Sequence, residues 1–390
     1  MSPASAVFGN PAVNRLYLHS ALLAVAENGG GIFIFVFLLN SGVPVPLTLC
    51  ALAAITLSRY FMRPGVVPLA RHIGLRKTLV IGVVIEAIAY LTLSRVHGLG
   101  SWLAVYIALG ALGSTLYWTC YHAYFAALGD TEQRGSQEGT KQAINGLVAI
   151  AAPVLGGMLL ANGGPIVAFG AITVVQLLAA VPLVGARNIP VPEDATIDRK
   201  TRRFAVRVMF ADSFFGACTN YVWQIALFVT LGEHFDSYGK AMALAALFGA
   251  VATIATGRLI DLGHGKYMLK MAYGLAALVL IVKGTTFGTP LRAVMANAFG
   301  ALLGPLLLPA LMTPIYNMAK ASSCPLRFHT ITEGGWDLGC AAACLIAAGM
   351  LAAGLGFSLP ILMGCAGLAA AYRFLRPRYE PSRVTEADSQ

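Results

Sequence analysis

Long apolar stretches alternate with short polar segments along the whole chain. Most of these stretches reach the roughly 20 residues that an α-helix needs to cross a hydrocarbon core of ~30 Å. Membrane-spanning β-strands would be about 10 residues long and would alternate in polarity. The pattern predicts helices over residues 15–39, 45–63, 76–95, 102–128, 140–161, 165–185, 205–231, 238–260, 267–287, 291–318, 331–354 and 357–375. We therefore expect an all-α polytopic membrane protein with twelve transmembrane helices.

The composition agrees with this interpretation, since 57% of the 390 residues are apolar and only 11% are charged. Soluble domains usually carry about 25% charged residues. Disordered chains are polar and rich in charge. The composition therefore excludes both a water-soluble enzyme and a disordered chain.

The positive charges are concentrated on one side of the predicted membrane. If the N-terminus is inside, all but four of the 27 Lys and Arg residues fall on the inner side; the four are Arg95, Lys240, Lys283 and Arg292. This distribution follows the positive-inside rule. We predict a multi-pass protein of the cytoplasmic (inner) membrane with both termini cytoplasmic. The net charge of +10 then orients the protein in the bilayer, and no nucleic-acid partner is expected.

A long polar segment divides the predicted helices into two sets of six. It covers residues 186–204 and holds two prolines and a run of mixed charge. We predict an N-terminal six-helix bundle (1–185), a cytoplasmic linker (186–204), a C-terminal six-helix bundle (205–378) and a polar tail (379–390). A weak internal repeat supports this division, because Glu138-Gly139 and Glu333-Gly334 open the fifth and eleventh helices half a chain length apart.

Two inner loops carry related motifs, at 66–82 and 257–274. The first retains Leu69, Ala70, Gly74, Arg76 and Lys77, and the second retains Gly257, Leu259, Asp261, Gly265 and Lys266. These loops resemble the G-x-L-a-D-r-x-G-r-k motif of the major facilitator superfamily. The resemblance implies two pseudo-symmetric six-helix bundles around a central cavity. It also implies an inner-side charge contact that favours one conformation.

The first loop departs from the family pattern at two positions. Val67 stands in place of the opening glycine, and Arg71 stands in place of the aspartate. Arg71 could instead pair with Asp130 or Glu132. We expect Asp261→Ala to shift the conformational balance more than Arg71→Ala.

The fifth helix contains Pro153-Val-Leu-Gly156-Gly157. This element resembles the P-x-x-G-G sequence of proton-driven exporters in the superfamily, although Ala152 replaces the glycine that precedes the proline. The alternative is ordinary packing of small residues between helices.

Five acidic residues lie within predicted spans: Glu27, Glu86, Asp212, Glu333 and Asp337. Charges at membrane depth are costly, so they are candidates for function. No Lys or Arg is expected near a span centre, because Lys283 can extend to the surface. The acidic balance favours protons or a cationic substrate. Glu27 is the first choice for proton binding, the alternative being a neutral carboxyl hydrogen-bonded to a neighbouring helix.

The other acids leave alternatives open. Asp212 either lines the cavity or pairs with Arg207 at the surface. Glu333 and Asp337 share a helix face and either bind a cation or pair with basic residues of the inner side, Lys320 or Arg327. Glu86 is expected to face the interior of its bundle.

Polar and aromatic side chains on the predicted cavity helices are candidates for substrate contact. They are Asn28, Tyr117, Trp118, Tyr121, His122, Asn220, Trp223, Gln224, Asn297 and Tyr316. Stacked rings suit a cationic or amphipathic ligand; the alternative is an aromatic belt at the membrane surface. In the tenth helix, Pro305, Pro309 and a third proline predict a bent gating helix.

These features predict a secondary transporter that works by alternating access. We expect efflux of a small organic solute, cationic or amphipathic, by proton antiport. The alternatives are a proton symporter or facilitator for a nutrient, a metal-cation exporter and a non-transporting sensor. Catalytic motifs, cofactor motifs and a convincing metal site are lacking, since Cys340 and Cys344 have no nearby His in the sequence. The expected partners are a small-molecule substrate and the lipid bilayer, and we expect a monomer.

Overall fold

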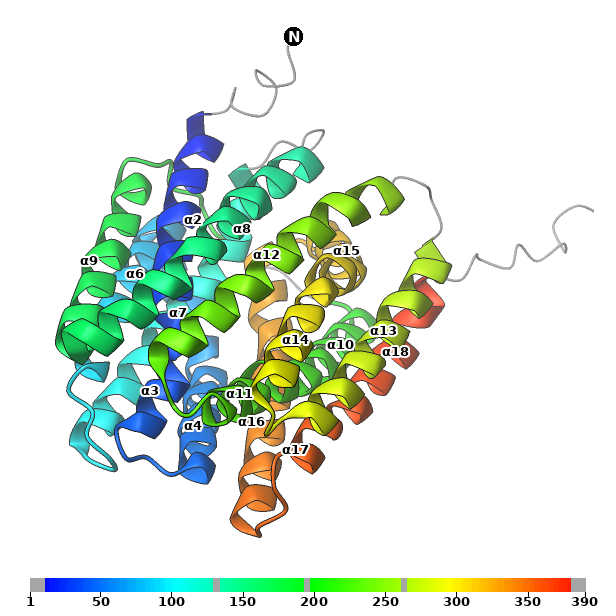
Figure 1. Cartoon of the computed structure of the whole chain (residues 1–390). Helices are drawn as coiled ribbons and strands as arrows, with labels where there is room; N and C mark the ends of the chain where they lie inside the picture. The colour runs from blue at the N-terminus through cyan, green and yellow to red at the C-terminus, as the bar shows by residue number, and fades with distance from the viewer. Residues whose placement is uncertain (1–10, 129–133, 193–196, 261–264, 380–390) are drawn as a thin grey trace, which may run out of the picture.

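The computed structural model describes residues 11–128, 134–192, 197–260 and 265–379 (Figure 1). In this part of the chain the regular secondary structure is helical. The first half comprises α2 (Pro11–Gly29), α3 (Ile34–Asn40), α4 (Val45–Met62), α5 (Val66–Ile73), α6 (Leu75–Leu93), α7 (Ser101–Leu128), α8 (Arg134–Met158) and α9 (Gly164–Val184).

The second half comprises α10 (Arg199–Ala217), α11 (Trp223–Thr230), α12 (Phe235–Ile260), α13 (Gly265–Thr286), α14 (Pro290–Gly300), α15 (Gly304–Ala321), α16 (Pro325–Ala352), α17 (Ser358–Leu362) and α18 (Gly364–Tyr379). Asp198 caps α10, accepting hydrogen bonds from the backbone N–H groups of Thr201 (2.9 Å) and Lys200 (3.0 Å). These bonds, with that of Thr201 foremost, hold the pKa of the Asp198 carboxyl below its usual value.

Three long helices are interrupted within the apolar region. The glycine run in the first helix ends α2 at Gly29, and a 3-10 turn over Gly31–Phe33 leads into α3. A five-residue π-helical turn, Cys218–Val222, separates α10 from α11. A 3-10 turn over Ala301–Leu303 separates α14 from α15. Such interruptions are tolerated at membrane depth where protein surrounds the freed backbone groups.

Eight segments of the described residues are long and apolar enough to cross a membrane. One of them, Ala143–Val184, covers two of the predicted spans. Three further predicted spans correspond to α6, to α10 with α11, and to α12. These segments are helical, but they are not among the eight that are long and apolar enough to cross a membrane. The described part of the chain is therefore all-helical with eight candidate spans, and the count of twelve stays a prediction.

Helices of each half pack mainly on one another. In the first half α6 packs against α7 and α9, and α2 packs against α8 and α9; in the second half α10 packs against α16 and α18. The halves meet along two helix pairs, α8 with α12 and α4 with α16. Figure 1 shows the blue-to-green helices of the first half beside the green-to-red helices of the second, with α12 running alongside α8.

Candidate functional site

Two arginines and two carboxylates form a buried cluster between α4 and α16. Arg63 Nε donates to Asp337 Oδ2 (2.8 Å), and Arg63 Nη2 contacts the same carboxylate. Arg59 Nε lies 3.0 Å from Asp337 Oδ1, and Arg63 Nη1 lies 3.4 Å from Glu333 Oε2. Arg63 is 1% exposed and Asp337 is 0% exposed. We call Arg59, Arg63, Glu333 and Asp337 the charge cluster; it joins the two halves of the chain.

The local sequence explains why these four side chains meet. On each helix the two charged residues are four positions apart, so they lie on one face, one turn above the other. The two pairs have opposite sign and the same spacing, so both can be matched at once when the helices pack side by side. Buried charges need such pairing, because an isolated ion in a medium of low dielectric constant is very costly.

Aromatic and polar groups from two further helices extend the charge cluster. His122 of α7 places Nε2 3.6 Å from Glu333 Oε1, and a hydrogen bond of 3.3 Å joins its Nδ1 to the Tyr316 hydroxyl of α15. The His329 ring stacks on His122 with centroids 5.4 Å apart. Four helices, α4, α7, α15 and α16, therefore converge on Glu333.

The sequence-based expectation for this region needs two corrections. For Glu333 and Asp337, pairing with Lys320 or Arg327 was one of the two alternatives, whereas the ion pairs of the described residues link them to α4 of the other half. The arginines of α4 were interpreted as charges of the inner side that only set topology. The hydropathy of a helix end does not show whether a long basic side chain turns into the protein. The sequence analysis therefore did not identify α4 as the partner of α16.

A second polar network lies inside the first half around Glu86 of α6. Gln176 Nε2 of α9 donates to Glu86 Oε2 (3.0 Å). Glu27 of α2, Arg59 of α4 and the Tyr90 hydroxyl lie within electrostatic range of Glu86. Among the described residues, no Lys, Arg or His side chain lies within 4.0 Å of either carboxylate. Glu86 therefore faces the interior of the first half, as expected, and it lies near Glu27.

His19 and Tyr117 connect this network to the middle of α7. His19 Nδ1 is 2.7 Å from the Ala179 carbonyl oxygen, and its Nε2 is 3.0 Å from the Tyr117 hydroxyl. Tyr117 is 0% exposed and stacks on Tyr121 with centroids 5.4 Å apart. Tyr117 was proposed to contact substrate, but its hydroxyl is bonded inside the first half. His19 was not singled out from the sequence, where a lone His gave no signal.

The candidates in the second half have several different environments. Trp223 Nε1 donates to Asn297 Oδ1 (3.0 Å), and both side chains are buried. The Tyr238 hydroxyl donates to Gln224 Oε1 (3.0 Å). Asn220 is exposed on the π-helical turn between α10 and α11. Of these residues, Asn220 is the one with an exposed side chain.

Two remaining candidates lie in the first half. Asn28 Nδ2 donates to the backbone oxygen of Ala24 within α2 (2.8 Å). Trp118 is partly buried, and its ring packs edge-on against Tyr117 with centroids 5.0 Å apart. Trp118 therefore belongs to the aromatic row of α7.

Lys283 corrects the prediction that basic residues avoid the span interiors. This side chain is 6% exposed, and its Nζ lies 5.1 Å from the centroid of the Trp223 ring. It donates to the backbone oxygen of Thr219 (3.4 Å), in the π-helical turn. Among the described residues, no carboxylate lies within 4.0 Å of it. Lys283 extends inward because the widened turn offers a carbonyl oxygen and Trp223 offers a ring face.

Asp212 is partly buried in α10 and lies within electrostatic range of Tyr273 of α13. The Tyr273 ring contacts that of Tyr372 with centroids 5.7 Å apart. No ion pair joins Asp212 to Arg207 within the described residues. The surface pairing considered for Asp212 is therefore not formed, and the side chain lies near α13.

The first loop motif ties α6 to the chain that follows α9. Gly74 has φ +96°, a left-handed conformation that favours glycine. Arg76 Nη1 donates to the carbonyl oxygens of Val184 (2.9 Å) and Ala186 (2.7 Å). Arg71 and Lys77 are exposed. The partners considered for Arg71, Asp130 and Glu132, lie outside the described residues, as does Asp261 of the second motif.

The Pro153–Gly157 element lies where helices approach most closely. A Cβ on Gly157 would lie 2.6 Å from the backbone oxygen of Phe235, at the start of α12. A Cβ on Gly156 would meet the backbone oxygen of Gly29 in α2. Pro153 lies inside α8, and its carbonyl oxygen faces Gly239 of α12. The element therefore allows α8 to contact both its own half and the other half.

The proline-rich helix is interrupted at a different place from the one predicted. The chain leaves the α-helical conformation at Ala301–Leu303, and Pro305 then occupies the first turn of α15. This position needs no backbone donor, so proline is well tolerated there. Pro309 lies within α15, and its side chain lies outside the described residues. The bend thus precedes the prolines.

Aromatic rings join the two halves at the end of the interface opposite to the charge cluster. The Phe33 ring packs edge-on against Tyr238 (centroids 5.5 Å apart), and it also contacts Phe235 (6.4 Å). After Phe33 the chain continues through α3 to Asn40. It then turns back along α4, whose 18 residues span about 27 Å and lead to Arg63. The aromatic rings and Arg63 therefore lie at opposite ends of α4. We call Phe33, Phe235 and Tyr238 the aromatic contact.

Comparison with known proteins identifies the class. The family model of the Major Facilitator Superfamily matches residues 21–325. The chain therefore belongs to the Major Facilitator Superfamily, whose members are transporters, and it is a multi-pass membrane protein. No curated protein matches the sequence.

Solved structures of this superfamily share the fold. The transporter FucP in the outward conformation superimposes with a TM-score of 0.66 at 14% identity, covering 95% of this chain and 99% of the other. A single-site variant of the E. coli fucose:proton symporter FucP gives a TM-score of 0.63 at 13% identity, with coverages of 95% and 99%. An autoinhibited peptide transporter of the POT family gives 0.64 at 12% identity, with coverages of 95% and 97%.

Proposed function

We propose that this superfamily member is a secondary active transporter of the cytoplasmic membrane, and that it exports a small organic solute, cationic or amphipathic, in exchange for protons. Two six-helix bundles, corresponding to the two halves, rock about a central site. The observation that carries the proposal is the pair Glu27 and Glu86. A Cβ on Gly31 would lie 3.8 Å from Glu27 Cβ and 3.1 Å from the hydroxyl of Tyr90, which follows Glu86 by one helical turn, and within the described residues neither carboxylate has a basic partner within 4.0 Å.

Two neighbouring carboxylates suit proton binding for an electrostatic reason. Interacting like charges disfavour simultaneous ionisation, so one carboxyl of the two readily binds a proton. A cationic solute that approaches the pair favours loss of that proton, which couples the two bindings by competition. The Gln176 amide orients Glu86, and Glu27 lies next to the glycine break of the first helix, where a ligand can approach the backbone.

The direction of transport rests on a different feature. The Pro153–Gly157 element resembles that of proton-driven exporters, and its Pro153 and Gly157 both lie against the backbone of α12. One structural neighbour is a fucose:proton symporter, so symport is the second candidate. A metal-cation exporter has less support, since the described residues contain no group of three or more His, Cys, Asp or Glu side chains placed to hold a metal ion.

Proton-coupled flux in proteoliposomes tests this proposal. A thermal-shift screen of organic cations with the purified chain first selects the solute that stabilises it most. A pH-sensitive dye trapped in the vesicles then reports proton movement when this solute is added outside. Antiport predicts that protons leave the vesicles as the solute enters. Glu27→Gln and Glu86→Gln should abolish this proton movement, while exposed Glu233→Gln, a matched control, should leave it unchanged.

The possible outcomes separate the alternatives. Proton entry together with the solute would replace antiport by symport. Proton movement that persists in both variants would refute the proton site, and the same assay with Asp212→Asn would then test the other carboxylate. Solute binding without flux of solute or protons would indicate a sensor.

A further inference from the structure

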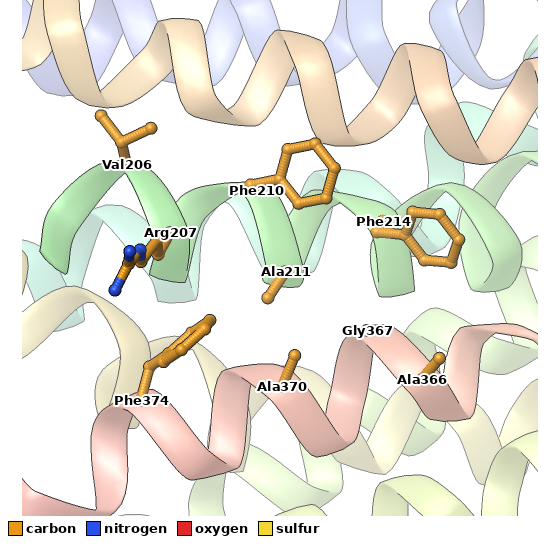
Figure 2. A pocket seen from close by; sticks show the side chains of 9 residues that line it. All are labelled: Val206, Arg207, Phe210, Ala211, Phe214, Ala366, Gly367, Ala370 and Phe374. Carbon is orange, nitrogen blue, oxygen red and sulfur yellow. The ribbon is translucent and has the colours of Figure 1, made fainter. Parts of the chain in front are cut away.

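A groove of about 450 Å³ lies between α10 and α18. Small residues form its floor, among them Ala211, Gly367 and Ala370, and Phe210, Phe214 and Phe374 form its walls. In Figure 2, Ala211 points from α10 towards α18, Ala370 and Phe374 point back towards α10, and Arg207 lies opposite Phe374 at one end. A Cβ on Gly367 would lie 2.8 Å from the backbone oxygen of Ala211, so the small residues bring α10 and α18 into close contact, and the groove runs beside this contact between the phenyl rings.

The groove is apolar along its length and basic at one end. Arg207 is the charged residue in its lining, and it is exposed. Arg203 precedes it by one helical turn and lies on the same face of α10. Arg378 of α18 lies one turn beyond Phe374, and its guanidinium group is 4.6 Å from the centroid of the Phe204 ring. Three arginines from two helices therefore gather at the same end.

These arginines have no carboxylate partner in the described part of the chain: no Asp or Glu side chain lies within 4.0 Å of Arg203, Arg207 or Arg378. Other basic residues of this molecule, such as those of the charge cluster, are paired. An exposed cluster of unpaired guanidinium groups is complementary to a phosphate, which arginine binds through two parallel hydrogen bonds. The apolar part of the groove beside it is complementary to a hydrocarbon chain.

We propose that this groove is a binding site for one anionic phospholipid of the membrane. An acyl chain lies along the floor between Phe210 and Ala370, and the phosphate headgroup contacts Arg207, with Arg203 and Arg378 beside it. Basic pockets between transmembrane helices are known to select anionic headgroups. The arginine-rich end belongs to the side predicted to face the cytoplasm, where the positive-inside rule also places it. The site is independent of the transported solute.

The occupant is a lipid of the bilayer and not a soluble anion, because apart from Arg207 the groove is lined by apolar residues. Phe210 is 39% exposed at its edge, which is unfavourable towards water and favourable towards hydrocarbon. A zwitterionic lipid would fill the groove equally well but would gain less from the three arginines. Selectivity for negative charge is therefore the property that identifies the site.

Native mass spectrometry of the full chain tests the headgroup contact. The protein is purified from nanodiscs that contain equal amounts of phosphatidylglycerol and phosphatidylcholine, and the retained lipid is counted. The wild type should retain phosphatidylglycerol preferentially. Each of Arg203→Gln and Arg207→Gln should lower this preference by about fivefold, the contribution of one arginine near an anionic surface. Arg202→Gln makes the same change on another face of α10 and should leave the preference unchanged.

A second pair of variants tests the acyl-chain contact. Ala370→Leu fills the floor of the groove and should reduce retention of both lipids, whereas Ala369→Leu, at an exposed position on another face of α18, should not. Equal retention of the two lipids by the wild type would overturn the proposal. So would an equal loss of preference in Arg202→Gln and Arg207→Gln, because the effect would then be one of total charge.

Discussion

The two ends of the interface between the halves are built from different chemistry. At one end, Arg59, Arg63, Glu333 and Asp337 hold α4 against α16 by buried ion pairs. At the other end, Phe33 packs on Tyr238 by ring contacts, and glycines bring α8 and α12 into backbone contact. The same pair of half-molecules is thus joined by charge at one end and by shape at the other.

This difference teaches how the two ends respond to change. A buried ion pair is strongly destabilised when a single partner is altered, because the other charge is left unpaired in a medium of low dielectric constant. A packed contact is destabilised more as the volume of side chain added or removed increases. One end is therefore sensitive to protonation and to single charges, and the other is sensitive to the size of side chains.

Asp337→Asn should have the largest effect. It leaves two buried arginines with one carboxylate, and breaking a buried pair costs about 3–5 kcal/mol. We expect a lower melting temperature of the purified protein. We also expect faster maleimide labelling of Cys324, a buried thiol that precedes α16 and packs with residues of the first half.

Asp236→Asn provides the matched control for this change. Asp236 pairs with Lys240 at 3.1 Å on an exposed surface. It should alter neither the melting temperature nor the labelling of Cys324, since exposed pairs contribute little. Equal effects of the two substitutions would show that the charge cluster does not hold the halves together.

Gly157→Ala should have an intermediate effect at the aromatic and glycine end. The new methyl group would lie 2.6 Å from the backbone oxygen of Phe235, so α8 and α12 must separate. Overpacking of this kind costs about 1–3 kcal/mol. Chemical crosslinking between cysteines introduced on α8 and α12 should slow accordingly.

Gly146→Ala, on the same helix, is the control for the glycine substitution. It has nothing within 4 Å of the added Cβ, and a glycine inside a helix is unfavourable relative to alanine, so the variant should be slightly more stable. If both glycine substitutions lower the stability alike, close packing does not explain the role of Gly157.

Lys283→Met should have the smallest effect on stability. It compares a buried cation that has no carboxylate partner with the paired arginines of the charge cluster. Lys283 is buried without a carboxylate partner, so its loss removes a cation–π contact but also removes a desolvated charge. We expect the unfolding free energy to change by less than about 1 kcal/mol. Arg63→Met, a similar change at a paired residue, should instead lower the melting temperature strongly.

The helices could be predicted from the sequence because apolar length has a direct physical meaning in a bilayer. The stretch at 331–354 matches α16 (Pro325–Ala352) up to its last two residues, and the glycine run after Glu27 marks the break that ends α2 at Gly29. The interior position of Glu86 also followed from the cost of exposing a carboxylate to lipid. The count of twelve spans is not established in the same way, since α6, α10 with α11, and α12 do not reach the criterion of length and apolarity.

The partners of the charged residues could not be predicted by the same reasoning. Arg59 and Arg63 lie at the end of an apolar stretch, where basic residues usually mark topology. A signal was nevertheless present, because their spacing of four residues matches the spacing of Glu333 and Asp337 with opposite sign. Lys283 turns inward for a reason that hydropathy does not contain, namely the carbonyl oxygen freed by the π-helical turn at 218–222.

The charge cluster holds two arginines and two carboxylates, so when all four are ionised it carries no net charge. The membrane potential does about 2.3 kcal/mol of work per elementary charge for every 100 mV that the charge crosses. A neutral group of ion pairs that separates and re-forms within the membrane therefore contributes little to this work. Any dependence of transport on voltage should then come from the charge carried by the solute and the proton.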